Sequence, residues 1–154
     1  MKRHKALQSL SQEHHHGLLL AQLIKAESPD YKNLPNTTNG KKEYTIRFFE
    51  ETLVPHFKKE EEVLFPCSRG KNVEIEKQID ELIDQHKKIY QLVARLNVSA
   101  SPETELNELG NLLEVHIRKE ERELFRELQL ILSEDELSKL ESELGSASAS
   151  CKTY

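Results

Sequence analysis

Three turn-rich stretches divide the chain into long segments, and this division constrains the fold more than any other feature. The stretches are dense in Pro, Gly, Asn and Ser, and they span Ser28–Lys42, Pro66–Asn72 and Asn97–Pro102. Between them, apolar residues recur every three or four positions, which is the spacing of one face of an α-helix. Long amphipathic helices joined by short loops predict an all-α fold, an antiparallel up-and-down four-helix bundle.

The predicted helix ends follow from capping residues. We expect helices that start at Ser11, run from about Lys42 to Phe65 and from Val73 to Leu96, and start again at Ser101. SEDELSKLESEL (Ser133–Leu144) opens with a capping box and predicts a short fifth helix at the C-terminal end. We therefore predict one domain over residues 1–145 and a disordered tail over residues 146–154.

One residue disturbs the pattern of the second segment. Pro55 lies inside it, directly before His56, where it removes a backbone hydrogen bond. We expect either a kink at this point or a break into two shorter helices.

Composition excludes several classes of function. The net charge is −5 and no basic stripe is present, so we expect no nucleic-acid partner. No apolar run reaches the roughly 20 residues that cross a bilayer, so we expect no membrane span. Cys67 and Cys151 lack CxxC spacing, which indicates reduced thiols and a cytoplasmic protein.

A ten-residue phrase occurs twice. HFKKEEEVLF runs from His56 to Phe65, and HIRKEERELF runs from His116 to Phe125. In each copy a glutamate follows the histidine by four positions, so Glu60 and Glu120 each share a helix face with an imidazole. Leu64 and Leu124 lie near the same faces, so both pairs border the core, where uncompensated charges are costly. A bound metal ion would compensate them.

The other two helices offer further histidines near their apolar faces. In the third helix the candidate is His86. In the first helix three adjacent residues are possible, namely His14, His15 and His16, and the apolar periodicity mildly favours His16. Four imidazoles and two carboxylates exceed the needs of one tetrahedral zinc, and mixed nitrogen and oxygen donors suit iron. Each glutamate can bridge two ions about 3.5–4 Å apart, so we infer a dinuclear iron site.

These motifs resemble those of the hemerythrin family, specifically its HHE cation-binding branch. HFKKEE and HIRKEE are similar to the ligand motifs of its second and fourth helices, LSQEH to its first and DQHKKI to its third, over about residues 10 to 130. The resemblance selects His14, with His15 as the second choice. The metal ligands that it implies are His14, His56, Glu60, His86, His116 and Glu120. It also implies a non-haem di-iron centre, bridged by both glutamates and an oxo or hydroxo group, with an open position for O2 or a similar diatomic ligand.

The sequence departs from the oxygen carriers of this family in three respects. Their third helix offers two histidines a turn apart, whereas His86 is flanked at that spacing by Leu82 and Tyr90. One iron therefore lacks an imidazole unless Tyr90 or water replaces it. Glu120 follows its histidine by four positions, where the carriers use an aspartate at five, and Pro55 is the third difference. These departures favour sensing, iron holding or redox chemistry over reversible oxygen carriage.

The predicted function is that of a binding protein. We expect a cytoplasmic di-iron protein that binds O2 or senses oxygen, NO or iron, with a possible redox partner. No substrate-pocket motif, catalytic nucleophile arrangement or phosphate-binding glycine loop is visible in the sequence, which favours a protein without enzyme activity. The alternatives are a di-iron redox enzyme that reduces O2 or peroxide, an iron storage protein and a metal-free bundle.

Overall fold

The described part of the chain is helical throughout apart from its loops. The computed structural model describes the backbone of residues 1–150 and the side chains of residues 1–147, and this part contains no strand. The all-α prediction is confirmed. The elements in chain order are α1 (Lys5–Ile24), α2 (Thr38–Phe48), η1 (Phe49–Leu53), α3 (Val54–Lys59), η2 (Glu60–Leu64), α4 (Phe65–Ser68), α5 (Val73–Val98), α6 (Pro102–Lys119), η3 (Glu120–Leu124), α7 (Phe125–Ile131) and α8 (Glu134–Ser150), where η marks a π-helical turn.

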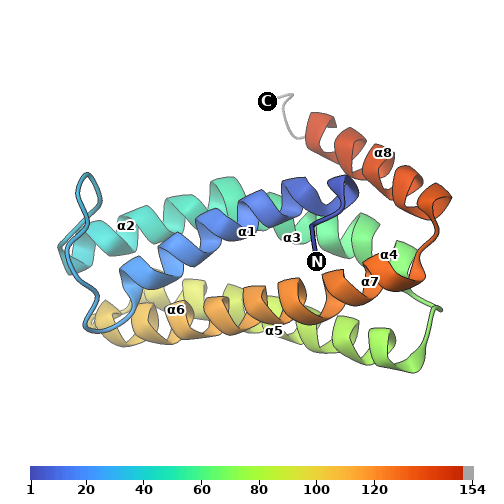
Figure 1. The fold of residues 1–154 in the computed structure, drawn as a ribbon. Coiled ribbons are helices and arrows are strands. Elements are labelled where there is room, and N and C mark those ends of the chain that lie inside the picture. Colours follow the sequence, from blue (N-terminus) through green and yellow to red (C-terminus); the bar gives the residue numbers. More distant parts are fainter. Residues whose placement is uncertain (151–154) are drawn as a thin grey trace.

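Several of these elements follow one another without a break. The segments from α2 to α4 form one helical rod, and those from α6 to α7 form another. Figure 1 shows α1, the α2–α4 rod, α5 and the α6–α7 rod lying along the length of the molecule, each running opposite to the one before it. In the same view α8 folds back at the end where α4 and α7 finish. All four rods therefore pass through the middle of the molecule.

The hydrophobic core is divided into two clusters. The first cluster is built by the start of α1, by α4 and the start of α5, and by α7 and α8. It includes Leu10, Phe65 and Phe125. The second cluster is built by the end of α1, by α2, η1 and α3, by the end of α5 and by α6. It includes Phe57 and Ile117. Five of the ten buried polar residues of the described part lie on stretches of helix between those that build the two clusters, namely His14, Lys59, Glu60, His86 and Glu120. The polar centre is thus enclosed by apolar side chains from both ends.

The first helix begins earlier than the sequence predicted. It starts at Lys5, and the side chain of His4 caps it by accepting a hydrogen bond from the N–H of Ala6 at 3.0 Å. The prediction that Ser11 caps this helix is wrong. Ser11 lies inside the helix and donates its hydroxyl to Glu121 Oε1 at 2.6 Å. The second rod also starts early, at Thr38, where the Thr37 side chain accepts from the N–H of Gly40.

The proline of the second rod does not break the helix. Pro55 is in the first turn of α3, and this helix follows the π-helical turn η1 directly. In this turn the N–H of Val54 bonds to the carbonyl oxygen of Phe49, an interval of five residues. The wider turn accommodates the residue that lacks an N–H, so the rod stays helical through Ser68. Of the two expected outcomes, a break into separate helices is wrong.

The C-terminal helix forms where the capping box placed it. Ser133 Oγ accepts from the N–H of Glu136 at 3.1 Å, and Glu136 Oε1 accepts from the N–H of Ser133 at 3.1 Å. Leu137, Leu140 and Leu144 are buried and join the first core cluster. The helix continues to Ser150, so residues 146–150 of the expected tail are helical, and residues 151–154 lie outside the described part.

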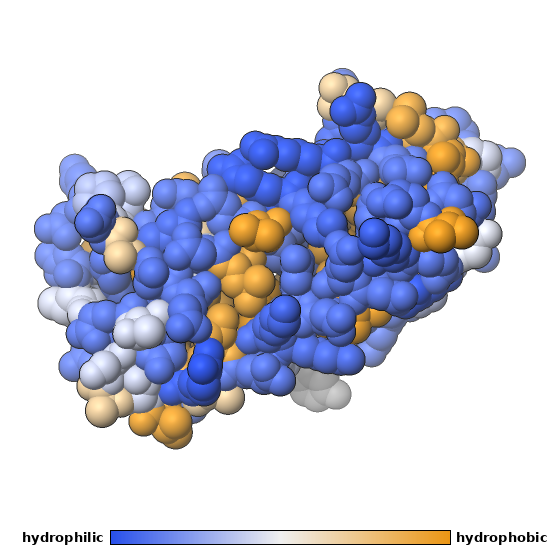
Figure 2. Space-filling model, turned by 90° about the horizontal axis from the view of Figure 1, so that it is seen from below, coloured by the Kyte–Doolittle hydropathy of each residue, from blue (hydrophilic) through white to orange (hydrophobic). Residues whose placement is uncertain are grey.

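The surface is largely hydrophilic. Figure 2 shows a face on which hydrophilic residues dominate and hydrophobic residues gather in a few small groups. Within residues 1–150, none of the helices has the length and apolar character needed to cross a membrane.

Two glycines allow α1 and α6 to approach closely. A Cβ atom at Gly110 would lie 2.9 Å from the backbone oxygen of Ala21, and one at Gly17 would lie 2.7 Å from Ile117 Cδ1. The contact at Gly110 involves backbone, which cannot move aside as a side-chain methyl group can. The spacing of α1 and α6, which carry His14 and His116, therefore depends most on Gly110.

This close approach can be tested with two matched substitutions. Gly110→Ala and Gly145→Ala both replace a glycine within a helix, which alone stabilises a helix by about 1 kcal/mol. A Cβ at Gly145 would have no neighbour within 4 Å, so we expect Gly145→Ala to raise the free energy of unfolding. We expect Gly110→Ala to lower it, as measured by urea unfolding. Equal stabilisation by both substitutions would contradict the packing assigned to Gly110.

Candidate metal centre

The two copies of the repeated phrase have the same local structure. In each, the histidine lies in the last turn of an α-helical segment and the glutamate is the first residue of a π-helical turn, η2 or η3. His56 Nε2 lies 2.5 Å from Glu60 Oε1, and His116 Nε2 lies 3.5 Å from Glu120 Oε2. The interval of four residues therefore brings each imidazole next to its carboxylate.

The π-helical turns explain the Leu-Phe ending of both phrases. In η2 the N–H of Phe65 bonds to the carbonyl oxygen of Glu60, and in η3 Phe125 bonds to Glu120 in the same way. A π turn holds one extra residue, so the residues after it shift around the helix axis. Leu64 and Phe65 are both buried as a result, and so are Leu124 and Phe125. Each phrase thus directs a carboxylate and two apolar side chains inward.

The remaining two helices each supply one histidine. His14 Nε2 lies 3.4 Å from Glu60 Oε1 and 3.3 Å from Glu120 Oε2. His86 Nε2 lies 3.0 Å from Glu60 Oε2. All six residues predicted from the sequence are therefore brought together, and each is at most 3% exposed.

The six side chains form two groups of potential ligand atoms. His14, His56, Glu60 and Glu120 make up the first group, and Glu60, His86 and His116 make up the second. Within each group, one donor atom from every residue lies within 4.8 Å of the others. Glu60 belongs to both groups: its Oε1 faces His14 and His56, whereas its Oε2 faces His86. Its carboxylate is thus placed to bridge two positions.

Most of the inward-facing atoms lack a hydrogen-bond partner among the described residues. They comprise the Nε2 atoms of all four histidines and all four carboxylate oxygens of Glu60 and Glu120. Burying a polar group without a partner costs roughly 1–3 kcal/mol, and more for a charged one. Nitrogen and oxygen atoms that converge in this way fit one or more metal cations, which would occupy the lone pairs of all these donors at once.

Each histidine has an oxygen atom near its outward-facing nitrogen, and in two of the four this oxygen is at hydrogen-bond distance. His14 Nδ1 lies 2.7 Å from Glu121 Oε1, and His116 Nδ1 lies 2.8 Å from Gln85 Oε1. Longer contacts of 3.6 Å join His56 Nδ1 to Glu13 and His86 Nδ1 to Glu61. A proton on Nδ1 leaves the lone pair of Nε2 free and directed inward, as metal binding requires.

The sequence predictions did not include these four outer partners. A local signal was present, because each is adjacent in the chain to a predicted ligand. Glu13 and Gln85 precede His14 and His86, and Glu61 and Glu121 follow Glu60 and Glu120. Each of them contacts a histidine of a different helix, however, and this pairing depends on the packing of the rods.

Aromatic rings surround the centre. The ring of Phe57 stacks on His86 with centroids 4.0 Å apart, and the ring of Phe125 stacks on His14 at 5.4 Å. Phe65 also stacks on His86, at 5.9 Å. These side chains are almost fully buried and exclude water from the centre.

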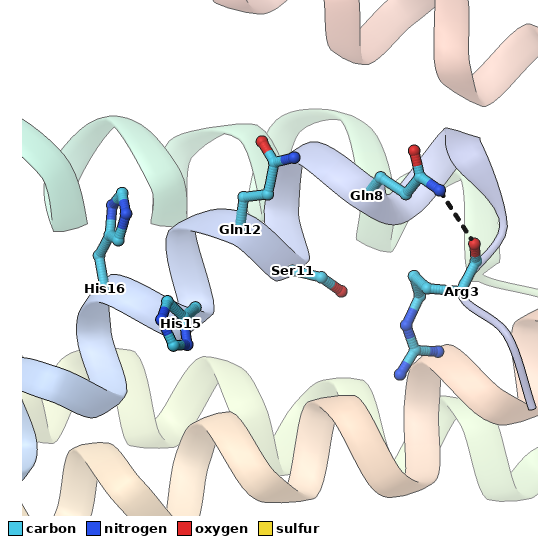
Figure 3. A pocket seen from close by; sticks show the side chains of 6 residues that line it. All are labelled: Arg3, Gln8, Ser11, Gln12, His15 and His16. Atoms are coloured by element: carbon cyan, nitrogen blue, oxygen red, sulfur yellow. Dashed lines mark hydrogen bonds between the residues drawn. The ribbon is translucent and has the colours of Figure 1, made fainter.

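The other residues considered from the sequence lie away from the centre. His15 and His16 are exposed and line an open pocket on the surface of α1, shown in Figure 3 with Arg3, Gln8, Ser11 and Gln12. The periodicity that favoured His16 is therefore misleading, because it is His14 that lies on the buried face. Tyr90 is 42% exposed, and its ring packs edge-on against Phe49 at 4.9 Å rather than joining either ligand group.

In the absence of metal, the buried groups change their proton affinities. Burial by itself lowers the pKa of His14 and His56, but nearby carboxylates outweigh it. The pKa of His14 is raised well above its ordinary value by Glu120, Glu121 and Glu60, and that of His56 is raised to about 9 by Glu60 and Glu13. Burial and the charge of Glu60 raise the pKa of Glu120 to about 7. Protonated imidazoles thus supply positive charge to the centre when no metal ion is present.

A helical domain with buried imidazole and carboxylate donors from four separate rods has the features of a helical metal-binding domain. Residues 5–128 match the hemerythrin HHE cation-binding domain, and this range covers most of the chain. The chain therefore belongs to the hemerythrin HHE cation-binding family, as the resemblance of its motifs indicated. No curated protein and no solved structure matches the chain.

The raised pKa of His56 predicts how the stability of the metal-free protein depends on pH. The pKa of this histidine is about 9 in the folded state, against about 6.5 for an unperturbed histidine. The folded state therefore holds more protons than the unfolded state between these values. The associated stability is complete below about pH 6.5 and is lost as the pH rises through about 9. We expect the free energy of unfolding to fall on the order of 3 kcal/mol over this range, as measured by urea unfolding with a chelator present. A constant or rising value would contradict the assignment.

Proposed function

We propose that this protein holds two iron ions in the buried centre and uses them to bind O2 or to sense oxygen, NO or iron. In this proposal the metal ligands are His14, His56, Glu60, His86, His116 and Glu120. The domain would be an antiparallel four-helix bundle in the cytoplasm, with each of the four rods contributing to the ligand set. The family match supports cation binding, and the identity and number of the ions are our inference.

The convergence of unpartnered buried donors is the observation that carries this proposal. Four Nε2 atoms and four carboxylate oxygens are buried in one region without a hydrogen-bond partner among the described residues. Charged or polar groups at this depth are stable only when a cation or a complete hydrogen-bond network compensates them. His14 and His116 also each have an outer hydrogen-bond acceptor at Nδ1, which leaves the inner lone pair of Nε2 free and which a purely structural ion-pair network would not require.

Two arguments support a pair of iron ions over a single ion. The oxygens of Glu60 face different histidines, which supports two neighbouring positions joined by one carboxylate. Four imidazoles with two carboxylates form a donor set of intermediate softness, which suits iron better than calcium or magnesium. An iron pair would supply reversible electron exchange and coordination of a small ligand.

The residues around the ligands would control that chemistry. Phe57, Phe65 and Phe125 keep bulk water from the centre, so the ligands act in a region of low dielectric constant. Glu121 and Gln85 fix the ring orientation and the Nδ1 proton of His14 and His116. A small diatomic molecule fits this enclosed setting better than a bulky substrate.

A redox enzyme that reduces O2 or peroxide is the second candidate. It is favoured by the third helix, where His86 has no second histidine a turn away and Tyr90 lies outside both ligand groups. A metal ion bound by fewer protein ligands keeps positions for a reactant. Sustained consumption of peroxide by the iron-loaded protein would support this candidate over a binding protein.

The proposed centre predicts the behaviour of two variants. Glu60→Ala and Glu120→Ala each remove a carboxylate that would serve both ions, so we expect each variant to lose at least one of two irons per chain. The measurement is metal analysis of protein purified without chelators. The absorption spectrum, recorded before and after anaerobic reduction and re-exposure to air, should show near-ultraviolet iron bands that bleach and return.

The matched control is Glu62→Ala. Glu62 lies in the same π-helical turn as Glu60, but its side chain is exposed. This variant should retain the iron content and spectrum of the unmodified protein. Unchanged iron content in both the Glu60 and Glu120 variants would rule out the proposed ligand set, and a protein that contains only zinc would rule out the iron assignment.

A further inference from the structure

The centre has an approximate internal two-fold relation. The first and second rods correspond to the third and fourth: His14 corresponds to His86, His56 to His116 and Glu60 to Glu120. The outer contacts follow the same rule. Glu121 on the fourth rod meets His14 on the first, at 2.7 Å, and Glu61 on the second rod meets His86 on the third, at 3.6 Å.

One pair of outer partners breaks this relation in its chemistry. Glu13 precedes His14 and contacts His56, whereas its counterpart Gln85 precedes His86 and contacts His116. Glu13 is a carboxylate that Lys59, a buried residue, holds in place through an ion pair. Gln85 is a neutral amide whose Oε1 lies 2.8 Å from His116 Nδ1. Two of the four histidines have Nδ1 within hydrogen-bond distance of an outer partner. His14 in the first ligand group meets the carboxylate of Glu121 at 2.7 Å, and His116 in the second group meets the amide of Gln85 at 2.8 Å.

The inner carboxylates do not distinguish the two positions. Glu60 faces histidines of both groups, and Glu120 Oε2 lies 3.3 Å from His14 Nε2 and 3.5 Å from His116 Nε2. The difference between the two positions therefore lies in the outer partners.

We propose that the two metal positions are unequal, that the His14–His56 position binds its ion more tightly, and that Gln85 is a positioning residue that weakens the His86–His116 position. This inference rests on the proposed two-metal centre. A carboxylate that accepts from Nδ1–H makes the imidazole a stronger donor, and changes to such partners alter metal affinity by about 10–100-fold. An amide oxygen is a weaker acceptor than a carboxylate, so His116, which meets Gln85, is a weaker donor to a metal ion than His14, which meets Glu121.

The test is an anaerobic titration of the metal-free protein with Fe(II) against a competing chelator. We expect two binding steps whose dissociation constants differ by about tenfold or more. His116→Ala should remove the weaker step and leave the tighter one, and His56→Ala should remove the tighter one. A single ion per chain, or none, would refute the two-metal centre itself, whereas two steps of equal affinity would refute only the inequality.

Gln85→Glu tests the role of the amide. The substitution preserves the size of the side chain and gives His116 the same type of partner as His14. We expect it to tighten the weaker step about tenfold and to change the pattern of iron(III) absorption bands. The reciprocal variant Glu121→Gln should weaken the tighter step.

A second glutamine on the same helix provides the control. Gln91 lies on α5 at an exposed position, so Gln91→Glu adds the same charge to the same helix away from the centre. If Gln85→Glu changes the weaker step no more than Gln91→Glu does, the effect is one of net charge, and the role proposed for Gln85 is wrong. A tighter step at the His86–His116 position in the unmodified protein would also overturn the proposal.

Discussion

The burial of two carboxylates and four imidazoles between two apolar clusters is the constraint on which the rest of this structure depends. Every inward-facing donor would prefer water to a dry protein interior. The protein provides positive charge in one of two ways. In the metal-free state, protons on His14 and His56 offset the carboxylate charge of Glu60. In the proposed metal-bound state, cations take the place of these protons, so binding would release protons and become more favourable as the pH rises.

Local backbone geometry connects this constraint to the repeated phrase. A regular α-helix places a residue and the fourth residue after it on one face, so it brings the histidine and the glutamate of each phrase together. In a regular α-helix the two adjacent apolar residues that end each phrase would point in directions about 100° apart. The π-helical turns η2 and η3 insert one residue and bring Leu64 and Phe65, or Leu124 and Phe125, into the core together. The ligand pair and the apolar wall beside it are therefore set by one local distortion, used twice.

Features of the fold and the candidate centre were predictable from the sequence where they depend on residues close together in the chain, and not where they depend on contacts between different helices. The helical class, the approximate extents of the helices and the capping box at Ser133 are expressed within a few neighbouring residues, and the sequence was sufficient for them. The start of the first helix was not predicted, because its cap is a histidine rather than a preferred capping residue. Because the predicted helix started at Ser11, the prediction left out Leu7 and Leu10. With them, the buried series of α1 selects His14 over His16; it comprises Leu7, Leu10, His14, Gly17, Ala21 and Ile24. The π-helical turns have no compositional signal, and the outer partners depend on contacts between different helices.

The internal two-fold relation bears on how the two halves of such a centre can come to differ. Residues that would bind the metal directly are constrained in type, since His and Glu must offer a lone pair at a fixed place. Their outer partners need only accept a hydrogen bond from Nδ1, and both a carboxylate and an amide can do so. The chemical difference between the halves is found at this outer level, where His14 Nδ1 meets the carboxylate of Glu121 and His116 Nδ1 meets the amide of Gln85. A change from glutamate to glutamine preserves the shape and the hydrogen bond while removing a charge, so it can alter the donor strength of a histidine without disturbing the packing of the four rods.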